Sequence, residues 1–345
     1  MKAVAPKPAA AIKANRPRRL LLIAGLVATV AIPFLFGGRD TLAAASDIAL
    51  DGYAALLSLV VASWLARALK LHLLLHRLKT HTTFVHSLGI SLATDLAFAA
   101  TPAGLGGFVA TIYYLRRAGT SGTGAATIMV LDQGTDLLFF SVSVPLLALA
   151  LAGSDSSPAM TTAALVSAAI VIAVATTIWL ARGKILAFVL APKPVFARWP
   201  RIQRAEQALQ ALLASSRNYV SLIVAAGPSF FLWIFVLTAV QWLTRYGVLW
   251  LTLLLLHHPV SFAVTFLLQV AVLHAALWTG IPAGGGGAEL GLTATLAHWV
   301  TPSQMATALV IWRAATLYAS LLAGAVAIIG LARKTPRAHG ARHPV

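Results

Sequence analysis

Two short apolar segments interrupted by proline and glycine limit what this chain can fold into. They read TPAGLGG at Thr101–Gly107 and IPAGGGG at Ile281–Gly287, 180 positions apart. A matched pair of broken helices in the two halves of an apolar chain indicates a binding site near the middle of the membrane in a transporter-like fold. The match continues at the same offset, which indicates an old duplication. The further matched residues are Ala126, Thr127 and Val130 with Ala306, Thr307 and Val310.

The composition is that of a membrane protein. Of the 345 residues, 59% are hydrophobic and 10% charged, with a mean hydropathy of +0.85, whereas about a quarter of a soluble domain is charged. The net charge of +17 comes from short basic clusters between apolar runs, so nucleic acid is not an expected partner. The absence of cysteine excludes disulfides and thiolate chemistry. No cofactor and no metal are expected.

A transmembrane helix needs about 20 apolar residues, and we predict an all-α polytopic membrane protein with six spanning helices. Two other apolar stretches, 84–118 and 260–299, are each cut by a glycine segment into two arms. At least one arm of each is too short to cross, so we predict two re-entrant helical hairpins whose loops lie inside the bundle. The predicted crossings are 20–36, 48–69, 122–152, 158–181, 226–256 and 303–331.

The positions of lysine and arginine favour this topology. With a cytoplasmic N-terminus and two returning hairpins, 23 of the 26 basic residues are cytoplasmic, in agreement with the positive-inside rule. This assignment includes a cluster from Arg67 to Lys79. A single crossing in place of the first hairpin would put Arg116 and Arg117 outside. The hairpins therefore enter from opposite faces, which predicts an inverted repeat in a bacterial inner membrane with both termini cytoplasmic.

The predicted organisation has five parts. A basic tail (1–19) precedes membrane repeat one (20–181), a cytoplasmic amphipathic linker (182–218), membrane repeat two (219–331) and a second basic tail (332–345). The first apolar run precedes Ala43–Ser46, so a cleaved signal peptide is the alternative to a retained helix. The linker either lies on the inner leaflet or is a solvated connection.

Ionisable side chains within the apolar segments are costly and usually face a cavity or a partner. In the repeat alignment Gln133 takes the place of Arg313, so both halves put a polar group at one depth. Acids opposite Arg313 would suit a zwitterionic or anionic head group, and the alternative is a structural salt bridge from Arg313 to Asp132 or Asp136. His274 is either a proton relay or a satisfied interior histidine. The six charged residues are Asp95, Asp132, Asp136, Arg245, Glu289 and Arg313.

Each glycine segment leads into a new helix, at about Phe108 and about Ala288, and free N–H groups at helix N-termini attract anions. A phosphate-bearing head group is the expected ligand, while close helix packing is the alternative role of the glycines. Glu289 has its own alternative role, stabilising the first turn of its helix. The candidate cavity residues are Pro102, Gly104, Gly106, Gly107, Asp132, Asp136, Pro282, Gly284, Gly285, Gly286, Gly287, Glu289 and Arg313, with Asp95, Arg245 and His274 as further candidates.

These motifs resemble a known family. The run Pro282–Glu289, followed by Arg313, is similar to the PGGxGxxE and later arginine signature of the lysylphosphatidylglycerol synthase transmembrane-region family, also called flippase-like membrane proteins. The segments Pro102–Gly106, Tyr114–Gly119 and Leu131–Asp136 resemble the first half of that family more loosely. Four positions depart from the pattern: Ala283 replaces a glycine, Gln133 an arginine, and Gly104 and Gly107 stand where an acid and an arginine are often seen. The resemblance runs from roughly Ile48 to Gly330.

By this resemblance, Glu289, Arg313 and Asp136 form the functional polar set, and Asp132 replaces the family's acid. In larger members this membrane unit is followed by a cytoplasmic domain that transfers lysine to phosphatidylglycerol. The resemblance covers the membrane unit alone, so it implies lipid movement without lipid synthesis. We expect a translocator of a membrane phospholipid or polyprenyl-linked lipid, served by a separate lipid-modifying enzyme. The alternatives are a membrane transferase acting on a lipid-linked substrate and an ion-coupled carrier of a small solute.

Overall fold

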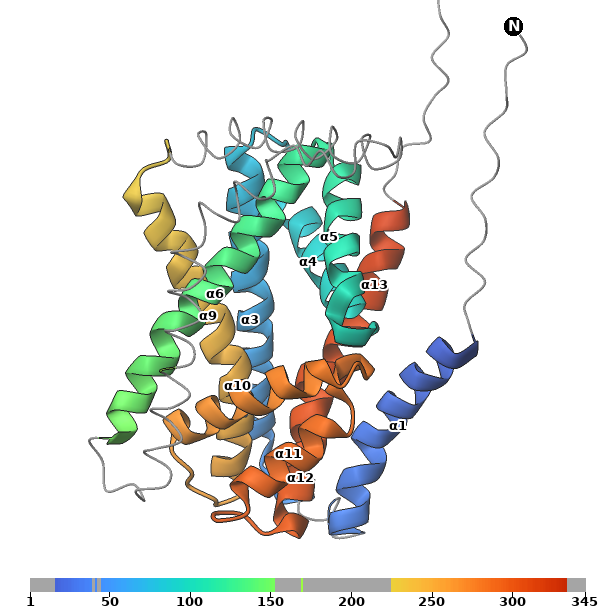
Figure 1. Cartoon of the computed structure of the whole chain (residues 1–345), viewed down its shortest axis with the longest axis vertical. Helices are drawn as coiled ribbons and strands as arrows, with labels where there is room; N and C mark the ends of the chain where they lie inside the picture. Colours follow the sequence, from blue (N-terminus) through green and yellow to red (C-terminus); the bar gives the residue numbers. More distant parts are fainter. Residues whose placement is uncertain (1–15, 39–40, 42–44, 153–168, 170–224, 334–345) are drawn as a thin grey trace, which may run out of the picture.

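The computed structural model describes residues 16–38, 41, 45–152, 169 and 225–333. Every regular element within these residues is helical, and the helices form an elongated bundle (Figure 1). Four of the described helices are long and apolar enough to cross a membrane, namely Leu50–Arg77, Gly122–Leu151, Pro228–Leu255 and Pro302–Arg333. The prediction of an all-α multi-pass membrane protein is confirmed.

These four helices match four of the six predicted crossings. They are α3 (Leu50–Arg77), α6 (Gly122–Ala152), α9 (Pro228–Leu255) and a composite of α12 (Pro302–Arg313), the π-helical turn η4 (Ala314–Tyr318) and α13 (Ala319–Arg333). The predicted crossing 20–36 corresponds to α1 (Arg16–Gly37), which contains Pro33. The predicted crossing 158–181, the linker and both tails lie outside the described residues apart from single positions and helix ends. The number six therefore stays a prediction.

Both glycine-interrupted stretches consist of two helical arms joined by a break, and we call each of them a hairpin. That the hairpins are re-entrant in a membrane stays a prediction. The first consists of α4 (Phe84–Ala99), the 3-10 turn η1 (Pro102–Gly104) and α5 (Leu105–Arg117). The second consists of α10 (Phe262–Trp278), η3 (Pro282–Gly284) and α11 (Gly287–Leu296). The longest of these arms has 17 residues, about 26 Å of helix, which is shorter than a hydrocarbon core of about 30 Å.

The two hairpins reach the middle of the bundle from opposite ends. Figure 1 shows α4 and α5 in the upper half and α10 and α11 in the lower half, and η1 packs directly against η3. Each first arm starts at a hydroxyl N-cap, because Thr83 Oγ1 accepts the His86 N–H and Ser261 Oγ accepts the Val264 N–H. The chain thus brings together two turns that lie 180 positions apart in sequence.

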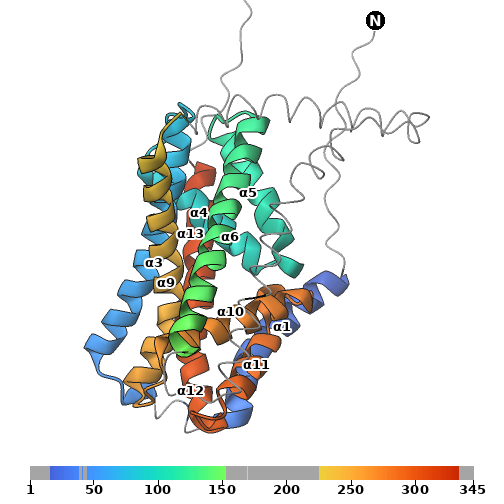
Figure 2. The same ribbon diagram turned by 60° about the vertical axis from the view of Figure 1, so that its left-hand side comes forward.

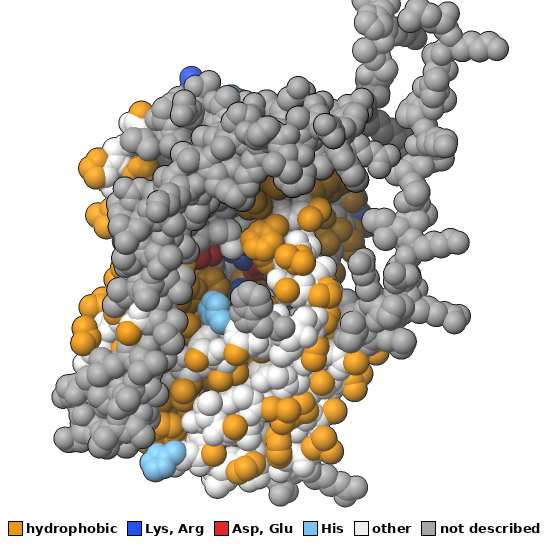
Figure 3. Space-filling model, in the orientation of Figure 1, with side chains coloured by type: hydrophobic (Ala, Val, Ile, Leu, Met, Phe, Trp, Pro, Cys, Tyr) orange, Lys and Arg blue, Asp and Glu red, His pale blue; other side chains and the backbone are white. Residues whose placement is uncertain are grey.

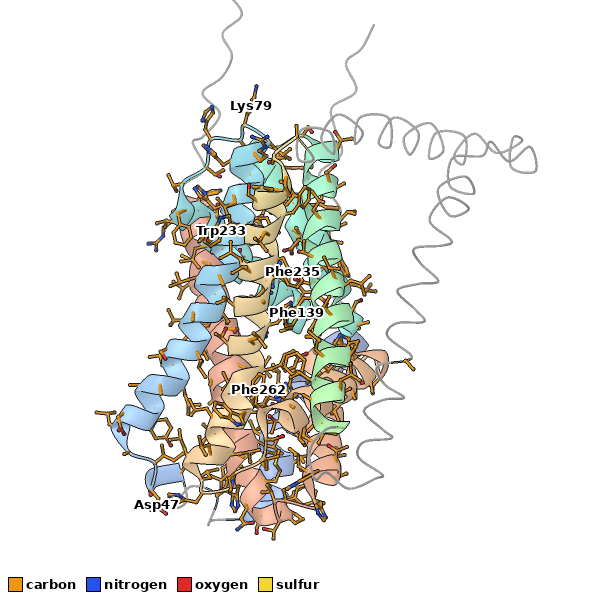
Figure 4. All side chains as sticks on the ribbon, turned by 90° about the vertical axis from the view of Figure 1, so that its left-hand side faces the viewer. Asp47, Lys79, Phe139, Trp233, Phe235 and Phe262 are labelled. Atoms are coloured by element: carbon orange, nitrogen blue, oxygen red, sulfur yellow. The ribbon has the colours of Figure 1, made fainter. Side chains whose placement is uncertain are left out.

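The remaining helices hold the hairpins between them. Helices α3 and α9 run side by side, as Figure 2 shows, while α13 packs along α4 and α1 along α12. Apolar side chains fill the space between helices along the bundle, among them the labelled Phe139, Phe235 and Phe262 (Figure 4). Lys79 and Asp47 mark opposite ends of the bundle in the same view. Among the described residues, charged side chains from several helices gather where the two breaks meet.

Candidate functional site

A cavity of about 510 Å³ lies where the two hairpin breaks meet. The first hairpin contributes Ala103 and Gly104 to its wall, and the second contributes Ala283 and Gly284. Helices α3, α6, α9 and α12 complete the wall. Figure 3 shows a hollow in the side of the bundle at mid-height, with acidic and basic side chains at its floor. The polar interior is therefore reached from the side of the helices.

A lysine holds two aspartates at one side of this region. Lys70 on α3 is completely buried, and its Nζ lies 2.7 Å from Asp132 Oδ1 and 2.9 Å from Asp136 Oδ1. The two acids are one turn apart on α6, so both carboxylates face the same partner. Asp136 also lines the cavity. One cation thus ties α3 to α6 through two ion pairs.

A second group of charges joins α3, α4 and α9. Arg67 Nη1 donates to Asp95 Oδ1, and Arg67 Nη2 lies 3.9 Å from Asp132 Oδ2. Arg245 on α9 lies 3.6 Å from the other oxygen of Asp95. Arg67, Asp95 and Arg245 all line the cavity. Through Asp132 this group is continuous with Lys70, so three cations and three acids form one network.

Arg313, the last residue of α12, stands apart from that network and pairs with the second hairpin. Its Nε donates to Glu289 Oε1 over 2.5 Å, and its Nη1 donates to the carbonyl oxygen of Ala283 over 3.3 Å. Its guanidinium carbon lies 4.6 Å from the ring centre of Trp312, a cation–π distance. The Nη2 atom is buried and has no hydrogen-bond partner among the described residues. Arg313 therefore keeps unused donor capacity beside the cavity that it lines.

The charges of the region cancel. The cations Lys70, Arg67, Arg245 and Arg313 face the acids Asp95, Asp132, Asp136 and Glu289 in contacts of 4.0 Å or less. Buried ion pairs are weak contributors to stability because each charge loses its hydration, but an unpaired buried charge is far worse. The arrangement is thus tolerable inside a bundle only as a complete set.

The alternative considered for Arg313, a salt bridge to Asp132 or Asp136, was wrong. Its partner is Glu289, one hairpin away, and Asp132 and Asp136 are paired with Lys70 instead. The assignment of the basic residues was also wrong at two positions. Arg67 and Lys70 belong to the buried network and not to a cytoplasmic cluster, because α3 continues as a regular helix to Arg77. A 28-residue helix is about 42 Å long, so a residue two turns before its end still lies inside the bundle.

The predicted site residues divide into two groups. Lining the cavity are Gly104, Asp136, Gly284, Arg313, Asp95, Arg245 and His274, as well as Gln133, the repeat counterpart of Arg313. The others surround it. Glu289 and Asp132 do not line the cavity themselves, but each is paired with an arginine that does, Arg313 and Arg67 respectively. A Cβ added to Gly107 would lie 2.1 Å from the Phe98 ring, and one added to Gly285 would lie 2.3 Å from the Gly25 carbonyl oxygen. Pro102 and Pro282 open the turns η1 and η3, Gly106 and Gly287 lie in the first turns of α5 and α11, and Gly286 is the N-cap of α11.

The N-termini of the two second arms already have internal partners. Thr101 Oγ1 accepts the Gly106 N–H over 2.8 Å, and Glu289 Oε2 accepts the Gly286 N–H over 2.8 Å. Glu289 therefore has the role at the helix N-terminus that was considered for it and, in addition, an ion pair with Arg313 that was not expected. These internal hydrogen bonds use part of the anion-binding capacity expected of the two helix ends. The Nη2 of Arg313 is a donor that stays available for an anion.

Sequence reasoning missed the α3 cations and an aromatic wall. Ser63, Arg67 and Lys70 recur at spacings of four and three, a polar stripe on one helix face that identifies an inward-facing surface. The wall consists of Phe140, Trp242 and Tyr246, with Gln269 beside them. Aromatic residues are common in any apolar helix, so the sequence alone carries no signal that separates these from packing residues.

Comparison with known proteins identifies the family. The sequence model described as Lysylphosphatidylglycerol synthase TM region matches residues 21–324. A UPF0104 membrane protein of Archaeoglobus fulgidus is 20% identical over 273 residues, which cover 78% of this chain and 83% of that protein. The match takes in α1 from residue 21 onward, both hairpins and every charged residue of the cavity. The chain belongs to the lysylphosphatidylglycerol synthase transmembrane-region family.

Proposed function

We propose that the protein translocates a lipid with a phosphate-bearing head group across a bacterial inner membrane. The head group would cross through the cavity between the hairpins while the acyl chains stay in the bilayer. Two features support the proposal: the cavity is open at the side of the bundle (Figure 3), and it is lined by Arg67, Arg245 and Arg313. A lateral opening suits a lipid, since its tails need not leave the hydrocarbon.

One observation carries the proposal, namely the unused donor of Arg313. Guanidinium groups bind phosphate through paired N–H donors, and Nη2 has no partner among the described residues. The Nε of the same side chain is fixed by Glu289 and the Nη1 by Ala283. The group is thus held in one orientation before ligand arrives, which lowers the entropy lost on binding.

The charge of the two bundle ends supports the proposed orientation. Lys79 marks one end of the bundle in Figure 4. Helices α3, α5 and α13 finish at that end, since Leu75, Leu115 and Leu331 share one apolar cluster. They bring Arg77, Arg116, Arg117 and Arg333 there, and the structure describes no acid at this end. Asp47 and Asp51 lie at the other end. Because lysine and arginine concentrate on the cytoplasmic side, we place the Lys79 end in the cytoplasm. The first hairpin would then enter from the cytoplasm and the second from the periplasm, as an inverted repeat.

The test is transbilayer exchange in liposomes. Purified protein is reconstituted with acyl-labelled fluorescent phospholipids, and dithionite quenching reports how fast inner-leaflet lipid reaches the outer leaflet. We expect exchange well above that of protein-free liposomes. The variant Arg313→Gln should slow it about 10- to 100-fold, because a charge-assisted hydrogen bond contributes roughly 1.5–3 kcal/mol.

Two variants control this test. Arg333→Gln removes an exposed arginine from the end of the same composite helix and should leave the rate unchanged. Arg313→Gln with Glu289→Gln removes both members of the pair, so no buried charge is left alone, and it should be as slow as the single variant. Rates equal to protein-free liposomes across anionic, zwitterionic and polyprenyl lipids would refute the proposal.

A further inference from the structure

The cavity has a second polar region that carries no charge. Its residues come from three helices: Phe140 on α6, Trp242 and Tyr246 on α9, and Gln269 and His274 on α10. We call these five residues the neutral subsite. All of them line the same cavity as Arg313, but none takes part in the ion pairs of that cavity. The subsite therefore needs a ligand group that is polar and uncharged.

Gln269 presents a buried hydrogen-bond acceptor without a partner. The side chain is completely buried, and its Nε2 donates to the Tyr246 carbonyl over 2.9 Å and to the Thr265 carbonyl over 3.1 Å. Both partners can only accept, which identifies the nitrogen and leaves Oε1 as the remaining atom. Oε1 has no partner among the described residues. A buried unsatisfied carbonyl costs about 1–3 kcal/mol, so such an atom marks a place where a donor belongs.

Trp242 and His274 complete the set with a donor and an acceptor. The Trp242 Nε1–H is buried and, in the part of the chain that the structure describes, finds no acceptor. The His274 Nδ1 lies 2.7 Å from the Val270 carbonyl oxygen, so Nδ1 carries the proton. In the neutral ring the exposed Nε2 is then an acceptor. The subsite offers one donor and two acceptors, a pattern that matches hydroxyl groups, since each of them donates and accepts.

An aromatic surface lies beside these groups. The rings of Trp242 and Tyr246 stack with centroids 5.6 Å apart, and Phe140 meets Trp242 edge-on at 4.8 Å and His274 at 5.5 Å. Such a surface binds the C–H faces of a polyol or sugar while its edges supply hydrogen bonds. An ammonium group would find no carboxylate among the five side chains, and an apolar group would leave Gln269 Oε1 unsatisfied.

We propose that the neutral subsite binds the hydroxyl groups of a polyol head group whose phosphate is held by Arg313. This inference rests on the proposed function and names its substrate class, a lipid with a phosphate linked to glycerol, a cyclitol or a sugar. The subsite distinguishes hydroxylated from unhydroxylated anionic lipids of equal charge. The charged residues alone make no such distinction.

Competitive lipid binding tests this directly. Detergent-solubilised full-length protein is incubated with phosphatidylglycerol, phosphatidylinositol or phosphatidylmethanol of identical acyl chains, and native mass spectrometry counts bound lipid. All three carry one phosphodiester charge, but phosphatidylmethanol has no hydroxyl. We expect at least a fivefold preference for one or both hydroxylated lipids, as each recovered hydrogen bond to a buried group is worth about that factor. A preference for phosphatidylinositol alone would identify a ring polyol, and for phosphatidylglycerol alone a linear one.

Variants assign the preference to the subsite. Trp242→Phe removes the N–H but keeps an aromatic ring, and His274→Phe removes the acceptor at an exposed position, so both should fold. Their double variant should bind all three lipids equally. Trp250→Phe on the same helix, outside the cavity, should keep the preference. Equal binding of the three lipids to the unaltered protein, or a preference that survives the double variant, would overturn the inference.

Binding separates this inference from the proposed function. If liposomes show no exchange but the lipid preference is present and lost in the double variant, the subsite stands and translocation fails. If exchange is present without any lipid preference, translocation stands and the subsite fails.

Discussion

At the scale of single residues, the two hairpin breaks share one unusual backbone conformation. Ala103 has φ 51° and ψ 20°, and Ala283 has φ 56° and ψ 12°, both in the left-handed region. An L-residue with a side chain pays roughly 1–2 kcal/mol there, and glycine does not. The following Gly104 and Gly284 are also left-handed, with φ of 70° and 62°. The sequence departs from glycine at a position whose geometry favours it.

We therefore expect Ala283→Gly to stabilise the protein. Removing the strain outweighs the extra chain entropy of glycine, so the free energy of unfolding should rise by up to about 1 kcal/mol. Thermal unfolding in detergent measures the change. Ala271→Gly, at an exposed helical position in α10, should instead destabilise by about 0.5–1 kcal/mol. If both variants were equally destabilising, the left-handed conformation of residue 283 would be wrong.

Lys70 gives the second prediction at this scale. Lys70→Met should destabilise by about 3–5 kcal/mol, because Asp132 and Asp136 would lose their closest cation while buried. Adding Asp132→Asn and Asp136→Asn to Lys70→Met should recover much of the loss, since no buried carboxylate is then left without a cation. Unfolding midpoints of the single and triple variants give the comparison. A triple variant less stable than the single one would show that the ion pairs themselves stabilise the fold.

At the scale of elements, α1 is built into the second hairpin. Gly25 and Gly285 approach so closely that a Cβ at Gly285 would lie 2.3 Å from the Gly25 carbonyl oxygen. The Tyr318 hydroxyl, on the π-helical turn next to Arg313, contacts Thr29 Oγ1 and donates to the Leu26 carbonyl over 3.1 Å. A helix removed as a signal peptide would leave these groups exposed. We therefore predict that α1 is retained in the mature protein.

We expect the mature protein to keep α1. We also expect Gly285→Val to displace α1 from the second hairpin. Intact-mass measurement should give a chain that includes residues 16–37. Gly285→Val should lower the unfolding temperature, whereas Gly330→Val, at a glycine with open space around it, should change it little. A mature chain that begins after residue 40 with unaltered exchange activity would contradict this account of α1.

At the scale of the whole molecule, the sequence predicts the architecture better than it predicts the partners. Apolar length and the paired proline-glycine runs are local signals, and they locate four long helices and both hairpin breaks correctly. Ion pairs depend on helix rotation and on how far a helix continues. The sequence therefore identified Arg313 and Glu289 without pairing them, and it left Arg67 and Lys70 outside the site. The neutral subsite combines residues of α6, α9 and α10, and no sequence pattern indicates it.

The account depends on two hairpins that turn back from opposite faces of the membrane. The chain has no native cysteine, so single substitutions can be labelled without background. Lys79→Cys and Arg117→Cys flank the first hairpin, and His257→Cys and His298→Cys flank the second, all at exposed positions. A membrane-impermeant maleimide added to intact cells should label the second pair and neither member of the first. Labelling of only one member of either pair would mean that the hairpin crosses the membrane, and the proposed lipid path would be wrong.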